Sequence, residues 1–250
     1  MKKVINLLSL LVISVMLLTS CSGITDVLFP PDYKEITNNI FTKYIEMNLI
    51  VETHSEGSSA KYKSQGSAVI YGRDDHYYYC LTNAHVIETD ISSKNVSYTV
   101  TDCYGKTYNA LFVHADVSRD LAVLKFIAGD NLCVVELADS DPAKNENVVA
   151  ISTSNHLINA VTYGKIRKYE TIDIFDDNGG DDTRVTFPVI WHDAPMWDGA
   201  SGSALLNLDM ELVGINYAVA TNSSNQFIYG FAVSVSHVRE YLEENNLIIK

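Results

Sequence analysis

Basic residues are scarce in this sequence. Its 250 residues include 18 Lys and Arg against 31 Asp and Glu, which gives a formal net charge of −13. Nucleic-acid binding needs clustered Lys and Arg that face phosphates, and an anionic membrane surface attracts only basic segments. The composition therefore argues against nucleic acid as a partner and provides no electrostatic attraction to a membrane. A neutral or basic polypeptide would not be repelled.

Cysteine is also scarce, with four in the whole chain. No Cys-x-x-Cys or His-Glu-x-x-His spacing occurs, so we predict no metal site and no cofactor. We interpret Cys80, Cys103 and Cys133 mainly as small buried hydrophobic residues, and one disulfide among them stays open. The Asp-rich stretch 173–182 resembles a calcium loop but lacks its closing Glu, so we interpret it as a solvated loop.

The sequence contains one long apolar run, over residues 4–18, and two lysines precede it. This run is short for a membrane-spanning helix and predicts a secretion signal over residues 1–20. The following Leu18-Thr19-Ser20-Cys21 resembles the lipobox of bacterial lipoproteins. That resemblance implies cleavage before Cys21, lipidation of its thiol, and an extracytoplasmic chain anchored to a bacterial membrane. An ordinary secretory signal, or an uncleaved anchor, is the alternative.

Residues 21–48 predict a tether followed by an amphipathic helix. Asp32 and Glu35 have the spacing of a capping box, and apolar residues then recur at helical spacing. We therefore expect one helix over residues 32–48. It either packs on the following domain or mediates self-association, so a homo-oligomer stays open.

From residue 49 onward the pattern indicates an all-β fold. Short runs rich in Val, Ile, Tyr and Thr alternate with Gly, Asn and Asp roughly every eight to twelve residues, as in a sandwich or barrel. A polar break over residues 139–147 divides the strands into two halves, and residues 235–246 predict a closing helix. The expected strands are Asn48–Thr53, Gly66–Tyr71, Tyr77–Thr82, Ser97–Thr101, Leu121–Phe126, Asn147–Ile151, Gly164–Tyr169, Ala204–Leu206 and Leu212–Ala218.

Three segments carry the residue types of nucleophilic catalysis. His85 follows a predicted strand, Asp120 precedes one, and Ser201 lies in a glycine-rich turn. A Ser hydroxyl needs an adjacent base, His is suited to that task near neutral pH, and a carboxylate fixes the His tautomer. The chain order His, Asp, Ser is that of chymotrypsin and differs from subtilisin and the α/β-hydrolases. We predict this triad, with the N–H groups of Gly199 and Ser201 as the oxyanion hole.

The same segments resemble the trypsin-like proteases of the HtrA (Deg) family, from about Ser64 to Leu242. The resemblance implies a chymotrypsin-like double six-stranded β-barrel, with barrel 1 over about 49–138, barrel 2 over about 147–234, and the active site between them. It also implies a serine endopeptidase that acts on envelope or secreted polypeptides. The motifs that carry it are Gln65-Gly66-Ser67-Ala68-Val69-Ile70, Leu81-Thr82-Asn83-Ala84-His85-Val86, Asp120-Leu121-Ala122-Val123-Leu124-Lys125, Leu137-Ala138-Asp139-Ser140-Asp141, Leu212-Val213-Gly214-Ile215-Asn216 and Tyr229-Gly230-Phe231-Ala232-Val233.

The sequence departs from this family at the nucleophile. The family usually has Gly-Asn-Ser-Gly-Gly, whereas residues 199–203 are Gly-Ala-Ser-Gly-Ser, so Ser203 adds a side chain beside the nucleophile strand. We also expect no C-terminal PDZ domain. By resemblance, the substrate pocket would be lined by Pro195, Met196, Trp197, Gly214, Ile215 and Asn216. No carboxylate falls where a trypsin-like pocket would hold one, so we expect an apolar residue before the cleaved bond. Asp193 and Asp198 flank this loop, and a basic preference set by either of them is the alternative.

Two other functions stay open on the sequence. One is a catalytically silent pseudoprotease that uses the same fold to bind proteins, which the Ser203 substitution favours. The other is an α/β-hydrolase esterase with Ser201 as nucleophile and His237 as base. That fold requires Gly at residue 203 and strands that alternate with helices, and this sequence has neither.

Overall fold

The structure, a computed structural model, describes residues 32–56, 61–89, 94–129, 131–154, 157–174 and 183–249. The predicted signal, Cys21 and most of the Asp-rich stretch lie outside these ranges. A compact unit that begins at Asn39 contains every site discussed below. Within the described ranges, no helix is both long and apolar enough to cross a membrane.

The N-terminal helix is shorter than the sequence pattern suggests. Helix α3 spans Tyr33–Thr42, and the Asp32 carboxylate caps it by accepting the N–H groups of Lys34 and Glu35, both at 3.1 Å. A separate 3-10 helix, η1 (Tyr44–Met47), follows it. The expected single helix over 32–48 was therefore wrong in its second half. Asn and Thr in the last turns of α3 are weak helix formers, and at Lys43 the backbone leaves the helical region.

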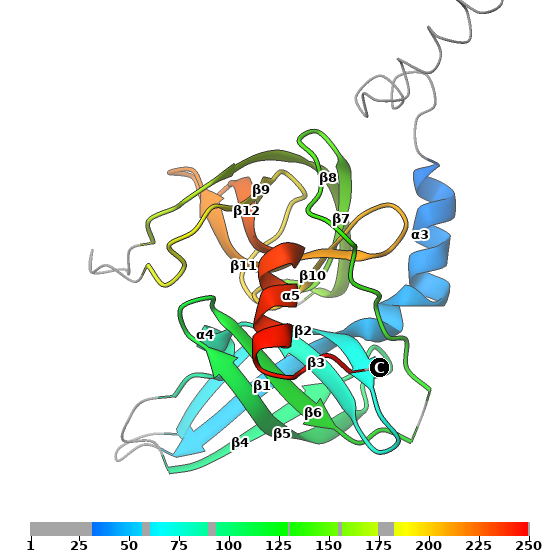
Figure 1. Cartoon of the computed structure of the whole chain (residues 1–250), viewed down its shortest axis with the longest axis vertical. Coiled ribbons are helices and arrows are strands. Elements are labelled where there is room, and N and C mark those ends of the chain that lie inside the picture. Colours follow the sequence, from blue (N-terminus) through cyan, green and yellow to red (C-terminus); the bar gives the residue numbers. More distant parts are fainter. Residues whose placement is uncertain are drawn as a thin grey trace, which may run out of the picture. The chain divides into compact units, whose positions relative to one another are not determined.

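The first half of the chain forms a closed antiparallel barrel, which lies in the lower part of Figure 1. Its strand order is β1-β2-β3-β6-β5-β4, and β1 pairs with β4 to close it. This pairing leaves the sheet without open edges, and apolar side chains of the strands fill the interior. The strands are β1 (Asn48–Glu56), β2 (Lys61–Arg73), β3 (Tyr78–Thr82), β4 (Lys94–Thr101), β5 (Thr107–Asp116) and β6 (Leu121–Phe126).

The second half forms another closed antiparallel barrel, in the order β10-β11-β12-β9-β8-β7. A core of small and branched apolar residues, including Val148, Ile166 and Ile190, fills it. Together the two barrels confirm the predicted chymotrypsin-like double six-stranded fold. The strands are β7 (Asn147–Ser154), β8 (Leu157–Glu170), β9 (Val189–His192), β10 (Ala204–Leu206), β11 (Leu212–Thr221) and β12 (Phe227–Ser234).

Two short helices complete the fold around the barrels. Helix α4 (Ala84–Ile87) is a single turn directly after β3, where the sequence suggested only a turn. Helix α5 (Val235–Glu244) follows β12 and packs on β11 and β12. The predicted C-terminal helix is therefore present. Neither β5 nor β9 was among the strands expected from the sequence.

The three described cysteines are free thiols, so the disulfide left open by the sequence is not formed. Cys80 is buried, whereas Cys103 and Cys133 are half-buried. Burial raises the pKa of the Cys80 thiol to about 12 and that of Cys103 to about 11. These thiols therefore stay protonated near neutral pH and are poor nucleophiles.

Candidate active site

His85 and Asp120 meet at one end of barrel 1. Helix α4 carries His85, and Asp120 lies immediately before β6, which pairs with β3. His85 Nδ1 is 2.7 Å from Asp120 Oδ2, and the His85 backbone N–H donates to Asp120 Oδ1 at 3.0 Å. The Asp120 side chain is 2% exposed, whereas that of His85 is 33% exposed. One buried carboxylate therefore fixes both the ring and the backbone of His85, and leaves the other ring nitrogen free to act.

The backbone of Asp120 has a positive φ of 50°, which is uncommon for a residue other than glycine. Two hydrogen bonds hold it there. The Asp120 N–H donates to the carbonyl of Val117 at 3.2 Å, and the Asn83 side-chain amide donates to the Asp120 carbonyl at 2.8 Å. Asn83 is fully buried. The turn before β6 is thus shaped to direct the carboxylate toward His85.

Ser201 lies in a tight turn before β10. Gly199 and Gly202 both have positive φ, at 92° and 85°. The N–H groups of Ala200 and Ser203 donate inside the turn, to the carbonyls of Trp197 at 3.0 Å and Ala200 at 2.9 Å. Within the described residues, the N–H groups of Gly199 and Ser201 make no hydrogen bond. Both N–H groups are therefore without an internal acceptor in this part of the chain, and their place in an oxyanion hole stays a prediction.

Ser67 of barrel 1 holds this turn in place. Its hydroxyl donates to the Gly199 carbonyl at 2.8 Å, and its N–H donates to the Ser201 carbonyl at 2.7 Å. The same hydroxyl accepts the Thr153 N–H from barrel 2 at 3.0 Å. A Cβ on Gly202 would collide with the Ser67 carbonyl oxygen, so only glycine fits there. The sequence motif around Ser67 was noticed, but not this function, because its partners lie more than 80 residues away.

The Ser201 hydroxyl is directed toward β11 and not toward His85. Its recorded partner is the Tyr217 carbonyl at 3.4 Å, and within the described residues it makes no hydrogen bond to the His85 ring. A rotation about the Cα–Cβ bond changes this direction without moving the backbone. Hydrogen bonds between nucleophile and base are often long in unliganded sites and tighten when substrate binds.

A small cavity of about 180 Å³ adjoins the His85–Asp120 pair. It is lined by His85 and Asp120 together with Ile174, Arg184, Tyr217 and Ala218. The Tyr217 hydroxyl is buried and has no hydrogen-bond partner among the described residues. Burial, and then the neighbouring Asp120 carboxylate, raise the pKa of Tyr217 well above its usual value. Tyr217 therefore stays neutral beside Asp120 in the lining of this cavity.

The predicted substrate pocket is only partly assembled from the expected residues. Met196 and Trp197 line a second cavity, of about 470 Å³, with Asp198, Val219, Thr221 and Asn225. Pro195 is half-buried beside them. Gly214, Ile215 and Asn216 lie inside barrel 2, and line neither this cavity nor the one beside His85. The part of β11 that lines a cavity begins instead at Tyr217, the residue after the predicted stretch.

Ser203 has a structural partner that the sequence did not reveal. Its hydroxyl accepts the Asn216 side-chain amide at 3.0 Å, and the Asn216 amide oxygen lies 3.0 Å from His192 Nε2. All three side chains are fully buried. Burial lowers the pKa of His192 to about 4, so its ring is neutral. The side chain that Ser203 adds thus makes a polar contact with buried Asn216 and does not obstruct the turn.

Among the described residues, no cluster of three or more His, Cys, Asp or Glu side chains is arranged to hold a metal ion. The His237 ring stacks on Phe187, with ring centroids 3.8 Å apart, and is 3.4 Å from Glu240. Among the contacts of the described residues, the His237 ring has no hydrogen bond or ion pair with Ser201. The esterase alternative, in which His237 is the base, therefore has no support in this geometry.

Comparisons with known proteins agree with the fold. The family described as "Trypsin-like peptidase domain" matches residues 66–215. A probable periplasmic serine endoprotease DegP-like of Halomonas elongata is 31% identical over 202 residues, which are 80% of this chain and 39% of that protein. The serine protease Do-like HtrA of Bacillus subtilis is 31% identical over 201 residues, 79% of this chain and 42% of its own length. The chain thus spans less than half the length of these relatives.

Among solved structures, the Rv3671c protease from M. tuberculosis in its active form matches with a TM-score of 0.65. The match covers 85% of this chain and 86% of that chain, at 22% sequence identity. At this identity the likeness concerns the fold.

Proposed function

Because the chain belongs to the trypsin-like peptidase domain family, we propose that it is a serine endopeptidase with His85, Asp120 and Ser201 as its catalytic triad. The observation that carries this proposal is the 2.7 Å contact between His85 Nδ1 and the buried Asp120 carboxylate, beside the glycine turn that holds Ser201. A carboxylate in this place fixes the tautomer in which Nε2 can accept a proton.

The mechanism follows from these positions. The Ser201 hydroxyl turns from the Tyr217 carbonyl toward His85, and its oxygen attacks the carbonyl carbon of the peptide bond. His85 takes the hydroxyl proton and then gives it to the leaving amine, while Asp120 stabilises the imidazolium. The N–H groups of Gly199 and Ser201 donate to the oxyanion of the tetrahedral intermediate. Water, deprotonated by His85, then hydrolyses the acyl-enzyme.

A fluorophosphonate tests this proposal directly, since it reacts only with a serine that a base and an oxyanion hole activate. Soluble protein covering residues 22–250 is treated with the reagent, beside the Ser201→Ala variant, and intact mass is measured. We expect a single adduct on the parent and none on the variant. Loss of the nucleophile of a working triad costs about 10⁶-fold in turnover, so the contrast is large.

The alternative is a binding module that uses the same fold without catalysis. One observation favours it, because the Ser201 hydroxyl contacts the Tyr217 carbonyl and not the His85 ring. A folded parent that forms no adduct would support the binding module and contradict the peptidase.

We further propose cleavage after an apolar residue, which Met196, Trp197 and Val219 in the lining of the pocket would contact. Of the two acidic residues near it, Asp193 pairs with the Arg167 guanidinium and accepts the Lys165 N–H, so its charge is already compensated. Asp198 lines the cavity but is exposed beside Trp197. We expect faster hydrolysis of peptides with Val than with Arg before the cleaved bond. Faster cleavage after Arg, reversed by Asp198→Asn, would show that Asp198 selects a basic residue instead.

We further propose that the chain works on polypeptides outside the cytosol, anchored by a lipid on Cys21. The support is the lipobox-like sequence and the periplasmic location named for several relatives. In a bacterial host, the full chain should partition into detergent as a lipidated form that starts at residue 21. A Cys21→Ser chain that partitions in the same way would contradict the anchor.

A further inference from the structure

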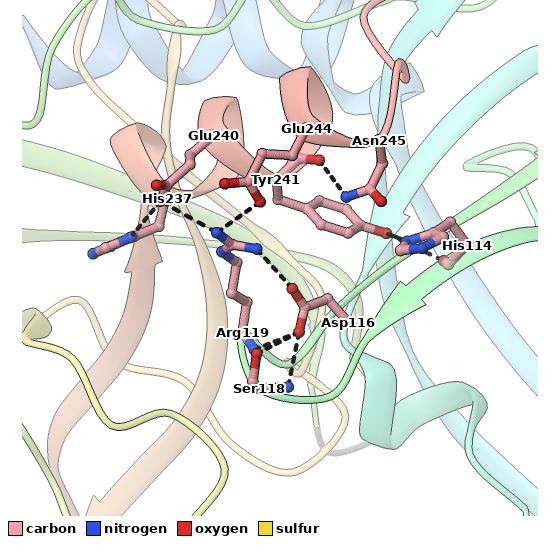
Figure 2. A network of polar contacts seen from close by, with 9 residues as sticks. All are labelled: His114, Asp116, Ser118, Arg119, His237, Glu240, Tyr241, Glu244 and Asn245. Atoms are coloured by element: carbon pink, nitrogen blue, oxygen red, sulfur yellow. Dashed lines mark hydrogen bonds and ion pairs between the residues drawn. The ribbon is translucent and has the colours of Figure 1, made fainter.

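Helix α5 makes hydrogen bonds to barrel 1 and to the segment that links the two barrels. Near its start, the Ser236 N–H donates to Asp141 at 2.9 Å, and Arg239 Nε donates to the Ala138 carbonyl at 2.9 Å. Near its end, the Tyr241 hydroxyl donates to the carbonyl of His114 on β5 at 3.2 Å, as Figure 2 shows. Helix α5, which packs on barrel 2, therefore also lies against barrel 1.

Arg119 is the centre of the contacts on the barrel 1 side. Its guanidinium is 2.8 Å from Asp116 Oδ2, 2.9 Å from Glu244 Oε2 and 3.5 Å from Glu240 Oε2. Figure 2 shows it between the turn after β5 and the glutamates of α5. The Arg119 side chain is 19% exposed, whereas the two glutamates are about half exposed. A partly buried guanidinium is thus held by carboxylates from two elements.

The same turn carries Asp120. Asp116 Oδ1 accepts the N–H groups of Ser118 at 2.9 Å and Arg119 at 3.2 Å, so it shapes the turn, while Oδ2 binds the guanidinium. Asp120 comes next in the chain, with the positive φ described above. A non-glycine residue keeps such a backbone only when its surroundings hold it there. The Arg119 contacts with Glu240 and Glu244 are one such restraint, from outside barrel 1.

We propose that Arg119 is a positioning residue, which joins the turn carrying Asp120 to α5 and so makes the C-terminal helix part of the active-site framework. This inference rests on the proposed peptidase function. Ion pairs with half-exposed glutamates contribute little to the free energy of unfolding. Their geometric effect is larger, because a displacement of about 1 Å in a catalytic group can cost about 100-fold in rate.

The test compares three variants that remove single charges. Arg119→Met keeps most of the apolar stem, Glu244→Gln removes one partner, and Glu243→Gln is a matched control on an exposed neighbour of the same helix. The rate of fluorophosphonate labelling should fall about threefold to thirtyfold in Arg119→Met and less in Glu244→Gln. It should not change in Glu243→Gln. For a peptide substrate, kcat should fall while KM stays constant.

A second readout does not depend on turnover. The proton shared by His85 Nδ1 and Asp120 should give a far-downfield proton NMR resonance in the parent. We expect it to broaden or disappear in Arg119→Met, to return in part in Arg119→Lys, and to persist in Glu243→Gln. A parent that is not labelled would refute the peptidase function, yet this resonance would still test Arg119.

The proposal fails if Arg119→Met and Glu244→Gln keep both the parent labelling rate and the parent resonance. It also fails if Arg119→Met loses both while its double variant with Glu244→Gln shows fully additive effects, because coupled residues give non-additive changes. Should Arg119→Met not fold, the exposed Glu244→Gln variant and the double variant Arg119→Lys with Glu244→Gln decide the question by the same two readouts.

Discussion

His85 and His192 belong to different barrels and face different groups. His85 Nδ1 meets the carboxylate of Asp120, and the side chain is one-third exposed. His192 ends β9, is fully buried, and its Nε2 lies 3.0 Å from the amide oxygen of Asn216. An amide oxygen accepts a hydrogen bond without carrying the charge that stabilises an imidazolium. Burial further disfavours the charged ring, so the pKa of His192 is lowered to about 4.

The difference shows what a histidine needs before it can serve as a base near neutral pH. It needs a carboxylate on one nitrogen and access to substrate on the other. The fold gives His85 a carboxylate partner and a place in the lining of a cavity, and it gives His192 neither. The second histidine instead forms part of a neutral polar chain with Asn216 and Ser203, inside barrel 2.

Asp120→Asn should remove the difference between His85 and His192, because it gives His85 the amide partner that His192 has. We expect this change to have the largest effect. Asparagine tolerates the positive φ at this position, so the turn should survive. We expect kcat/KM to fall about 10⁴-fold near neutral pH, measured by peptide hydrolysis. An unchanged melting temperature would serve as the folding control. Activity within tenfold of the parent would mean that another group pairs with His85.

The stability of the protein in acid tests the other half of the comparison. Between about pH 6.5 and pH 4 the unfolded chain protonates His192 while the folded chain does not, so the free energy of unfolding falls as the pH falls. Below pH 4 the loss in the free energy of unfolding that His192 causes amounts to about 3 kcal/mol. Urea unfolding at several pH values should show a shallower decline in His192→Gln than in the parent.

The exposed His76 provides the matched control for that experiment, since His76→Gln removes a histidine without touching the barrel interior. If His76→Gln and His192→Gln flatten the pH dependence equally, burial of His192 is not the cause.

Ser203→Gly should have the smallest effect and sharpens the distinction between structure and catalysis. The change restores the family's usual glycine but leaves the buried Asn216 amide without its acceptor. We expect a loss of about 1–2 kcal/mol in the free energy of unfolding, measured by urea denaturation. Ser203→Ala should lose a similar amount. A labelling rate that rises more than tenfold in either variant would instead mean that Ser203 restrains the nucleophile.

Local pattern was enough to predict much of the fold. Leu121–Phe126 and Ala204–Leu206 were predicted with the bounds that the structure gives, and the second run is flanked directly by the polar residues Ser203 and Asn207. Strand β5 was missed since its outward and inward residues do not alternate regularly along its length. Strand β9, of four residues, was also missed.

Part of the candidate site could also be predicted from the sequence. Sequence motifs and their order predicted that His85 and Asp120 would lie together, and the structure brings them into contact. The contacts of Ser67 and the chain from Ser203 to His192 depend on how distant strands are aligned, which no local pattern encodes. The residues of β11 that line a cavity lie further along the strand than the sequence predicted, because the sequence does not show where that strand leaves the barrel interior.

The contact between Ser67 and the turn of Ser201 also bears on when the site forms. Its partners are more than 130 residues apart in the chain, so the loop between them must close before the hydrogen bonds can form. Contacts of such long range form late and slow the folding of β-rich proteins. We therefore expect the nucleophile turn to take shape only after both barrels have assembled. Under the proposed peptidase function, a newly made chain would then complete its folding before it could cut itself or its neighbours.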